Sequence, residues 1–384
     1  SKEFASAGLQ RLSAYKNFLQ EFGLYSLYQT SVSLTVSGRE QNWPVVPVGA
    51  GRNFDWEKDS SIAEVHVADI AGLLKIVRHP EEAAQNTLVW LPPSLAGYLG
   101  DITASFSERP YNSPEALDSA AAKEKENGRQ VILVFEETPV ADTASWSLHV
   151  SRDIRRKHFA NVAGMIEGST RPDEYVIFSG HYDHLGILPA VAGDTIANGA
   201  DDDASGTTAV IMLSKYFKWH RPARSVSFVA FTAEETGGLG SRYFSEQQDP
   251  DKVIAMFNIE MIGKESKFGK NSAFITGFER SDFGHILQRN LEGSTFSFYP
   301  DPYPEQNLFY RSDNATLARQ GVPAHTISTT QIDKDQFYHT VNDELATLDI
   351  KNITNIIKAI AISSGSIVNG TDTPARIEKA LLKN

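Results

Sequence analysis

Two segments decide the fold expected for this chain: YVIFSGHYDHLG at residues 175–186 and VSFVAFTAEETGG at residues 226–238. Each begins with a short apolar or β-branched run, and such runs are typical of buried parallel strands. Each run is followed within a few residues by imidazole or carboxylate side chains. Open α/β sheets bind ligands beyond the carboxyl ends of their strands. We therefore expect His181, Asp183, Glu234 and Glu235 to meet at one edge of a sheet.

The segment GADDDASG, residues 199–206, places three carboxylates side by side. They could form a solvated acidic turn or cap the following helix, but adjacent carboxylates repel one another unless a cation is bound. Glu260 follows the apolar run of residues 253–257, where a carboxylate is costly unless it is paired or bound to a metal. His339, far along the chain, supplies a second imidazole.

Each of these residues alone indicates little, since a single His is more often an ordinary surface or core residue. Asp183 lies two residues after His181 on an extended segment, so it points the same way and could hold the imidazole ring for a metal. Of the adjacent Glu234 and Glu235, one would bind a metal and the other would exchange a proton with water. Together, two His and at least three carboxylates suffice for two metals that share one Asp.

Taken in order, these phrases resemble those of the M28 family of zinc metallopeptidases, which includes bacterial aminopeptidases, glutamate carboxypeptidase and relatives of glutaminyl cyclase. The resemblance spans roughly residues 159–343, and all the metal motifs occur in the family's order. The matching phrases are GHYD (180–183), GADDDASG (199–206), AEETGGLGS (233–241), NIEM (258–261), RSD (311–313) and YH (338–339).

The resemblance implies two Zn²⁺ per chain, for which Co²⁺ or Mn²⁺ could substitute. Asp202 would bridge the two ions. His181 and Glu260 would complete the first site. Glu235 and His339 would complete the second.

The resemblance also implies the catalytic roles. Glu234 would be the general base, Tyr338 would stabilise the oxyanion, and Asp183 would support His181. The Asp202–Asp203 bond is a candidate for the cis peptide that the family has after its bridging Asp. His184 is close to these residues in sequence, but the family pattern does not use it.

The implied function is a two-zinc exopeptidase, in the first place an aminopeptidase that acts on peptides with a free N-terminus. A hydroxide shared by two metals would attack the scissile carbonyl, and Glu234 would move its proton to the departing amine. The alternatives are a glutaminyl-cyclase-like acyltransferase, a carboxypeptidase, and a binding scaffold without catalytic activity. The scaffold is disfavoured because no expected ligand is missing from the sequence.

Two residues depart from the family pattern. Glu260 stands where many members have Asp, so its longer side chain could alter the spacing or affinity of that metal site. Asn314 follows Ser312 and Asp313 where His is common, and the sequence does not say what this changes.

The composition is that of an ordinary soluble domain: 384 residues, 41% hydrophobic and 22% charged. A net charge of −12 disfavours a nucleic-acid partner. The absence of Cys excludes disulfides and thiolate metal sites.

No apolar run is long enough to span a membrane. The chain starts at Ser1, so a trimmed export signal, and hence a periplasmic or extracellular enzyme, is the expectation for its location. The sequence does not indicate an oligomeric state.

The expected fold is α/β, with a mixed, mainly parallel central sheet covered by helices on both faces, plus a smaller inserted α/β unit. The resemblance identifies the larger part as a zinc exopeptidase fold. We expect the catalytic domain to comprise residues 1–40 and 148–384, and the Pro-broken region 41–147 to be an insertion that faintly resembles a protease-associated domain. A helix is predicted over residues 8–22, and a frayed helix over 372–384.

Overall fold

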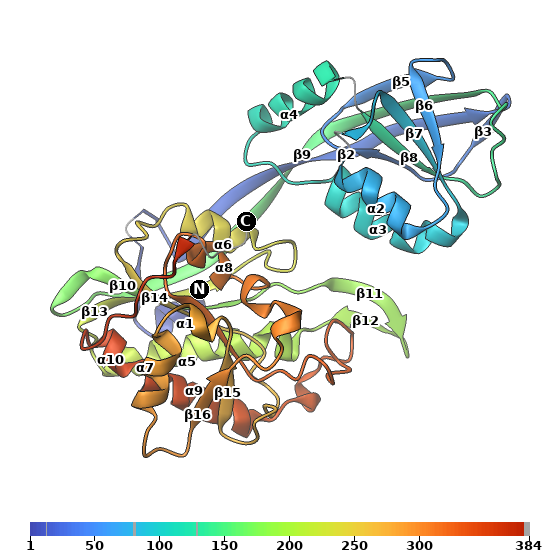
Figure 1. Cartoon of the computed structure of the whole chain (residues 1–384). Coiled ribbons are helices and arrows are strands. Elements are labelled where there is room, and N and C mark those ends of the chain that lie inside the picture. The colour runs from blue at the N-terminus through green and yellow to red at the C-terminus, as the bar shows by residue number, and fades with distance from the viewer. Residues whose placement is uncertain (13, 80–81, 128–129, 380–384) are drawn as a thin grey trace. The chain divides into compact units, whose positions relative to one another are not determined.

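The computed structural model describes all residues except 13, 80–81, 128–129 and 380–384 (Figure 1). The chain packs into two compact units. The larger unit contains Ser1–Phe22 and Phe159–Asn384, and the smaller contains Gly23–His158. Two long strands, β2 (Leu19–Val36) and β9 (Trp146–Ile166), each include residues of both units.

The larger unit is built on a mixed sheet in the order β16-β15-β17-β14-β10-β13-β9. Its central strands β13, β10, β14 and β17 are parallel neighbours, whereas β9 pairs antiparallel with β13, and β15 pairs antiparallel with β17. The strands are β10 (Arg171–His181), β13 (Arg224–Phe231), β14 (Val253–Ile259), β15 (Ser272–Ile275), β16 (Ser297–Pro300) and β17 (Ala324–Ser328), with the short β1 (Gln10–Arg11) beside β9.

Side chains alternate across this sheet and form a core on each face. Phe178 of β10 lies opposite Phe228 and Phe257 on the neighbouring strands, and its ring stacks on both. This face is covered by α5, α7 and α9, while Ile177 belongs to the core on the opposite face, under α6 and α8. The expected α/β sheet with helices on both faces is therefore confirmed. The helices of this unit are α1 (Lys2–Ser6), α5 (Gly206–Trp219), α6 (Leu239–Ser245), α7 (Phe283–Asn290), α8 (Asn314–Ala318), α9 (Ile350–Ser363) and α10 (Gly365–Val368).

The smaller unit contains a four-stranded sheet in the order β4-β8-β7-β6, with strands that are almost wholly buried at β7 and β8. Strands β2, β3 and β5 belong to the sheet that continues along β9. The elements are β3 (Arg39–Gln41), β4 (Val45–Val48), β5 (Asn53–Glu57), β6 (Ile62–His66), α2 (Ile70–Arg78), β7 (Asn86–Leu91), α3 (Leu99–Ile102), α4 (Pro114–Asn127) and β8 (Val131–Phe135).

The predicted helix over residues 8–22 is wrong. This segment contains β1 and, from Leu19, the start of β2, in which Gln20, Phe22 and Leu24 alternate inward. The helical spacing of apolar residues was outweighed by pairing within the sheet. Residues 372–378, for which a helix was also predicted, are not helical. Residue 379 is 3-10 helical, and residues 380–384 of the predicted helix lie outside the described residues.

The unit boundaries at 22/23 and 158/159 differ from the expected boundaries at 40/41 and 147/148. The physical reason is that each boundary lies inside a continuous strand, β2 or β9, so no loop marks the change of unit, and Gly23 at the first boundary continues β2. Among the described residues, no helix has both the length and the apolar character needed to cross a bilayer.

His325 gives the larger unit a pH-dependent stability. The ring is fully buried, Nδ1 donates to the carbonyl of Thr276, and Oγ of Ser281 lies 2.8 Å from Nε2. Burial lowers the pKa of His325 to about 4, so the unfolded chain binds a proton that the folded chain lacks between pH 4 and 6.5. Stability therefore rises with pH across this window, by up to ~3 kcal/mol from this residue.

Urea unfolding of wild type and His325→Asn at several pH values tests this assignment. The variant should be less stable at pH 7 but lose less stability on acidification, with the difference following one proton, or about 1.4 kcal/mol per pH unit. Equal pH slopes for the two proteins would show that His325 binds its proton equally well in the folded and unfolded states, which would contradict the assignment.

Candidate metal centre

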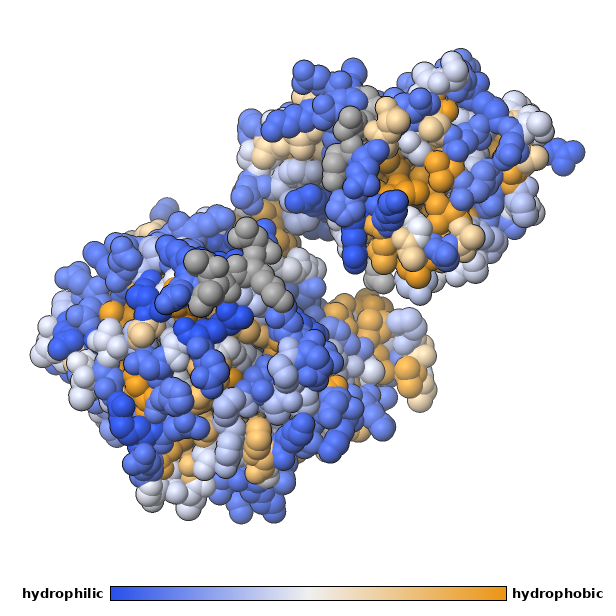
Figure 2. Space-filling view, viewed as in Figure 1, coloured by the Kyte–Doolittle hydropathy of each residue, from blue (hydrophilic) through white to orange (hydrophobic). Residues whose placement is uncertain are grey.

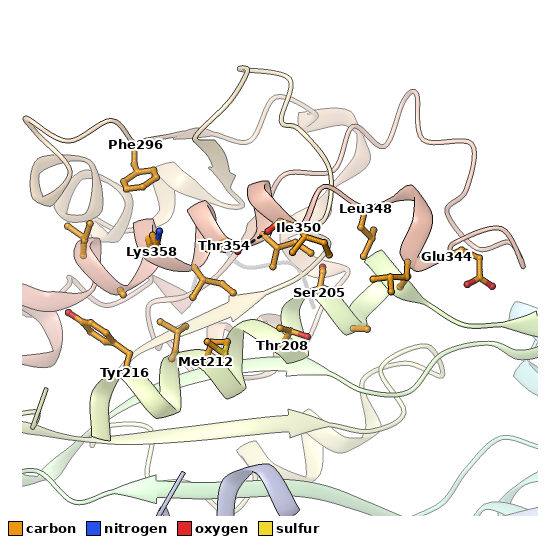
Figure 3. A pocket seen from close by; sticks show the side chains of 18 of the residues that line it. Ser205, Thr208, Met212, Tyr216, Phe296, Glu344, Leu348, Ile350, Thr354 and Lys358 are labelled. Atoms are coloured by element: carbon orange, nitrogen blue, oxygen red, sulfur yellow. Dashed lines mark hydrogen bonds between the residues drawn. The ribbon is translucent and has the colours of Figure 1, made fainter. Parts of the chain in front are cut away.

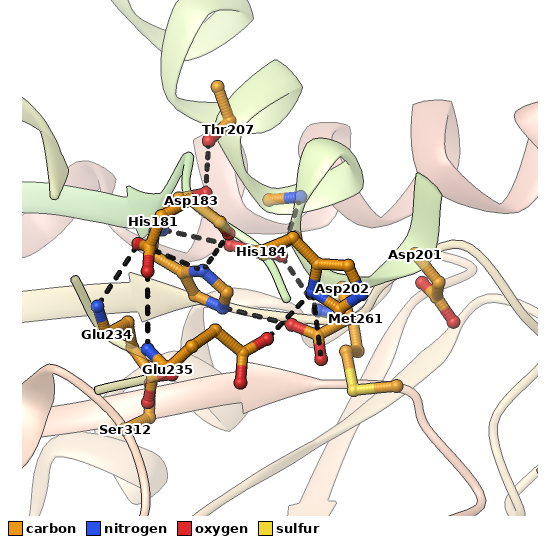
Figure 4. Close-up of polar contacts among 12 residues, drawn as sticks. His181, Asp183, His184, Asp201, Asp202, Thr207, Glu234, Glu235, Met261 and Ser312 are labelled. Atoms are coloured by element: carbon orange, nitrogen blue, oxygen red, sulfur yellow. Dashed lines mark hydrogen bonds and ion pairs between the residues drawn. The ribbon is translucent and has the colours of Figure 1, made fainter. Parts of the chain in front are cut away.

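Three neighbouring strands bring the predicted site residues to one edge of the sheet. β10 ends at His181, and its parallel neighbours β13 and β14 end shortly before Glu234 and at the residue before Glu260. The distorted helical turn η4 (Ala200–Ser205) adds Asp202, and the segment between β17 and α9 adds His339. The close-up shows the side chains of His181, Asp202 and Glu235 converging from different elements (Figure 4).

His181, Asp202 and Glu260 form a first group whose donor atoms lie within 4.8 Å of one another. Nε2 of His181 lies 3.0 Å from Oδ1 of Asp202 but makes no well-directed hydrogen bond, and Oε2 of Glu260 has no hydrogen-bond partner among the described residues. Burial, reinforced by Asp202 and opposed by His181, raises the pKa of Glu260 to about 7. A cation between these buried atoms would satisfy all of them.

A second group joins Asp202 and Glu235 to two imidazoles. Nε2 of His339 lies 3.2 Å from Oδ2 of Asp202 and 3.3 Å from Oε2 of Glu235. Nδ1 of His184 lies 2.7 Å from Oε1 of Glu235 and 3.9 Å from Oδ2 of Asp202. Although burial acts to raise it, the pKa of Glu235 is lowered by His184 and His339. His184, which the family pattern leaves out, is thus a neighbour of this group and fixes one oxygen of Glu235.

Asp203 shapes the turn that presents Asp202. Its carboxylate accepts hydrogen bonds from the backbone amides of His181, Gly206 and Met261. The Asp202–Asp203 peptide is cis, as the family resemblance implied. Gly206 is required here, because a Cβ atom would lie 2.1 Å from the carbonyl oxygen of Ile259.

Asp343 and Lys264 hold the same turn through contacts with Asp201 and with the backbone amides. Asp343 accepts hydrogen bonds from the amides of Asp201 and Asp202 at 3.0–3.1 Å. Lys264 lies 2.6 Å from Asp335, 3.4 Å from Asp201 and 3.9 Å from Asp343. Of the three consecutive Asp residues, only Asp202 therefore faces the two groups. Sequence reasoning missed Lys264 and Asp343, because no motif spacing marks a Lys that pairs with Asp201 or a carboxylate that accepts from the backbone amides of the turn.

Asp183 supports the site in a different way from the one predicted. Nδ1 of His181 lies 3.1 Å from the backbone carbonyl of Asp183, whereas the carboxylate is 3.8 Å from this nitrogen. The carboxylate accepts hydrogen bonds from the backbone amides of Glu234 and Glu235 instead. Asp183 therefore orients the imidazole through its carbonyl and holds the two Glu residues through its side chain.

Glu234 and Tyr338 flank the two groups without belonging to either. Burial, reinforced by Glu260 and Asp313, raises the pKa of Glu234 to about 10. Burial also raises the pKa of Tyr338, so its hydroxyl remains a donor. The ring of Tyr338 stacks on that of His339 with 3.8 Å between centroids. A cavity of about 50 Å³ beside Glu260 is lined by Tyr338, Arg311 and the hydroxyl-bearing residues Thr276, Ser312, Thr326, Ser328 and Thr330.

Asn314, the second departure from the family pattern, is structural. It is fully buried, its amide donates to the carbonyls of Phe309 and Ala324, and its oxygen accepts from Thr326. It secures the start of α8 against β17 and does not reach the two groups.

The donor set fits a pair of divalent cations. It combines imidazole nitrogens with carboxylate oxygens, the ligands that such ions take in the absence of thiolates. Without cations, several buried carboxylates would lie close together, and burial already raises the pKa of Asp203 and of Asp201, the latter to about 6. Nε2 of His181 and Oε2 of Glu260, which face the first group, are among the buried atoms that have no hydrogen-bond partner.

The model of peptidase family M28 matches residues 161–363, just over half of the chain. The chain belongs to peptidase family M28. The match includes every residue of the two groups described above, so the M28 assignment and the geometry concern the same part of the molecule.

Individual relatives are similar to this M28 chain to different extents. A "Probable zinc metalloprotease" of Pyrenophora teres f. teres is 35% identical over 109 residues, which are 28% of this chain and 23% of that protein. The chain spans about a quarter of the length of such fungal relatives. Leucine aminopeptidase 1 of Penicillium rubens is 28% identical over 336 residues, 82% of each chain. In fold, the chain is similar to a zinc aminopeptidase of Bacillus subtilis, with a TM-score of 0.55, 13% identity, and coverage of 100% of this chain and 88% of that one.

Proposed function

We propose that this M28 chain is an aminopeptidase that uses two zinc ions, held by the two groups that share Asp202. The observation that carries the proposal is the position of Asp202, whose two oxygens face His181 on one side and His339 on the other at 3.0 and 3.2 Å. A carboxylate that faces two imidazoles through separate oxygens suits a bridging ligand. When bound, zinc supplies Lewis-acid polarisation of the scissile carbonyl and acidifies water.

The residues of the chain itself carry the proton transfers. Burial and neighbouring carboxylates raise the pKa of Glu234, and bound cations would offset those carboxylates, so that Glu234 ionises, takes a proton from the attacking water and returns it to the departing amine. Asp183 holds the backbone of Glu234 in place through its hydrogen bond to the Glu234 amide. The hydroxyl of Tyr338, which stays protonated, donates to the oxygen on which negative charge develops. The carboxylates around the site favour a substrate with a positively charged N-terminus.

Arg311 favours a second candidate, a carboxypeptidase. Arg311 is exposed, lines the small cavity beside Glu260 and Tyr338, and forms no ion pair with any described residue. A guanidinium in this position could bind the terminal carboxylate of a peptide.

Matched substrates separate the two candidates. We expect aminoacyl-anilides with a free amine to be hydrolysed at least ~10²-fold faster than their N-acetylated forms, because a site built to receive an amine rejects analogues that lack it. Release of the last residue from N-acetylated peptides with a free C-terminus, without cleavage of the anilides, would instead assign a carboxypeptidase.

Export from the cytoplasm stays a prediction, which cell fractionation tests.

A further inference from the structure

The hairpin β11 (Gly186–Val191) and β12 (Asp194–Ala197) is an apolar surface without a partner among the described residues. The two strands pair only with each other, and the hairpin extends away from the rest of the larger unit (Figure 1). Its sequence, GILPAVAGDTIA, contains one charged residue, Asp194. The side chain of Ile187 is 82% exposed, and Val191 and Ile196 are also exposed. Figure 2 shows the hairpin as an orange projection. A two-stranded hairpin of this kind is marginally stable in water on its own.

A second apolar surface lies between α5 and α9 of the same unit. These helices enclose a groove of about 760 Å³ that opens to solvent (Figure 3). Its exposed side chains include Met212 and Tyr216 of α5 and Ile350 and Ile362 of α9. Contiguous exposed apolar surface of this extent marks an interaction site.

The two surfaces match each other in length, in polarity and in charge. From Ile350 to Ile362 the groove follows α9 for ~18 Å, and the six residues of β11 extend for ~20 Å. The groove starts at the base of the hairpin, where Asn198 donates to Glu344. Lys358 lies further along α9 and has no ion pair among the described residues. Asp194, at the tip of the hairpin, has none either.

We propose that a second copy of this chain occupies the groove, with the β11–β12 hairpin of each copy lying between α5 and α9 of the other. In a two-fold arrangement, the hairpin and the groove of both copies are buried, and the assembly closes as a dimer. In this arrangement the base of one copy's hairpin lies at the Asn198 end of the other copy's groove. The hairpin then runs along α9, so Asp194 at its tip lies near Lys358 of the other copy. The hairpin also connects His184 to the turn that carries Asp202, so the dimer contact holds the connection between two parts of the metal centre.

Sedimentation equilibrium of the full chain, over a wide range of concentrations, tests the proposal. Wild type should be a dimer. Ile187→Asp in the hairpin and Ile350→Asp in the groove should each raise the dissociation constant at least ~100-fold, because each places a charge in the apolar contact. Val32→Asp, at a comparably exposed apolar residue of β2 in the smaller unit, is the matched control and should remain a dimer.

Exchanging the charges of Asp194 and Lys358 gives a test in which a restored dimer cannot result from unfolding of a variant. Asp194→Lys and Lys358→Asp should each weaken the dimer about tenfold, and the double variant should restore it. Failure of this rescue would overturn the Asp194–Lys358 contact. A chain that is monomeric at every concentration, or a dimer that survives both Ile187→Asp and Ile350→Asp, would overturn the proposed interface. Folding of each variant is checked by circular dichroism.

Discussion

Asp202→Asn is expected to remove zinc from both groups and to abolish hydrolysis. The substitution keeps the size of the side chain but replaces one of its two oxygens by an amide that cannot bind a cation. Because the oxygens of Asp202 face His181 and His339 separately, one group loses its oxygen and the other keeps only a neutral amide oxygen, so both groups lose the negative charge that holds a cation. The fall in activity should exceed the ~10²–10⁴-fold loss typical of a missing general base.

The matched control for this variant is Asp173→Asn. Asp173 is exposed and belongs to β10, the strand that ends at His181. This control should bind zinc and hydrolyse substrate as wild type does. Full metal content in Asp202→Asn, measured by elemental analysis after dialysis, would contradict the bridging role even if activity were lost.

Glu234→Gln is expected to retain both metals and to lose activity by ~10²–10⁴-fold. Glu234 belongs to neither group of ligands, and its backbone amide is held by Asp183 whether or not the side chain is charged. Gln fills the same space but cannot accept and return a proton. The loss should therefore appear in kcat, with little change in KM.

Glu246→Gln, at an exposed residue that directly follows α6, is the matched control and should leave kcat unchanged. Two results are informative about Glu234. A variant with undiminished kcat would remove Glu234 from the mechanism. A variant that has lost its metals would identify Glu234 as a ligand instead of a base.

The sequence indicated which residues lie together at the edge of the sheet, but it did not indicate the long strand β2. His181, Glu234 and Glu260 could be placed together because each follows an apolar run, and parallel strands present their carboxyl ends at one edge. The sheet itself was predictable for the same reason. The helix expected over residues 8–22 failed, since spacing alone does not show that Phe22 and Leu24 alternate inward on a long strand.

What the sequence could not show were contacts that depend on tertiary structure. The carboxylate of Asp183 was expected to hold the ring of His181, but it accepts the amides of Glu234 and Glu235, which only a folded chain brings near. Likewise, nothing in the phrase HYDHLG indicates that His184 turns toward Glu235. The only indication in the sequence that His184 lies near the site was its position three residues after the predicted ligand His181.

The central claim is that two cations share Asp202. Native mass spectrometry of the full chain, reconstituted with zinc and freed of excess metal, tests it directly. The geometry predicts two zinc ions per chain in wild type and none retained in Asp202→Asn. A single ion per chain in wild type, or no ion at all, would contradict the paired-metal site and the hydrolytic function proposed from it.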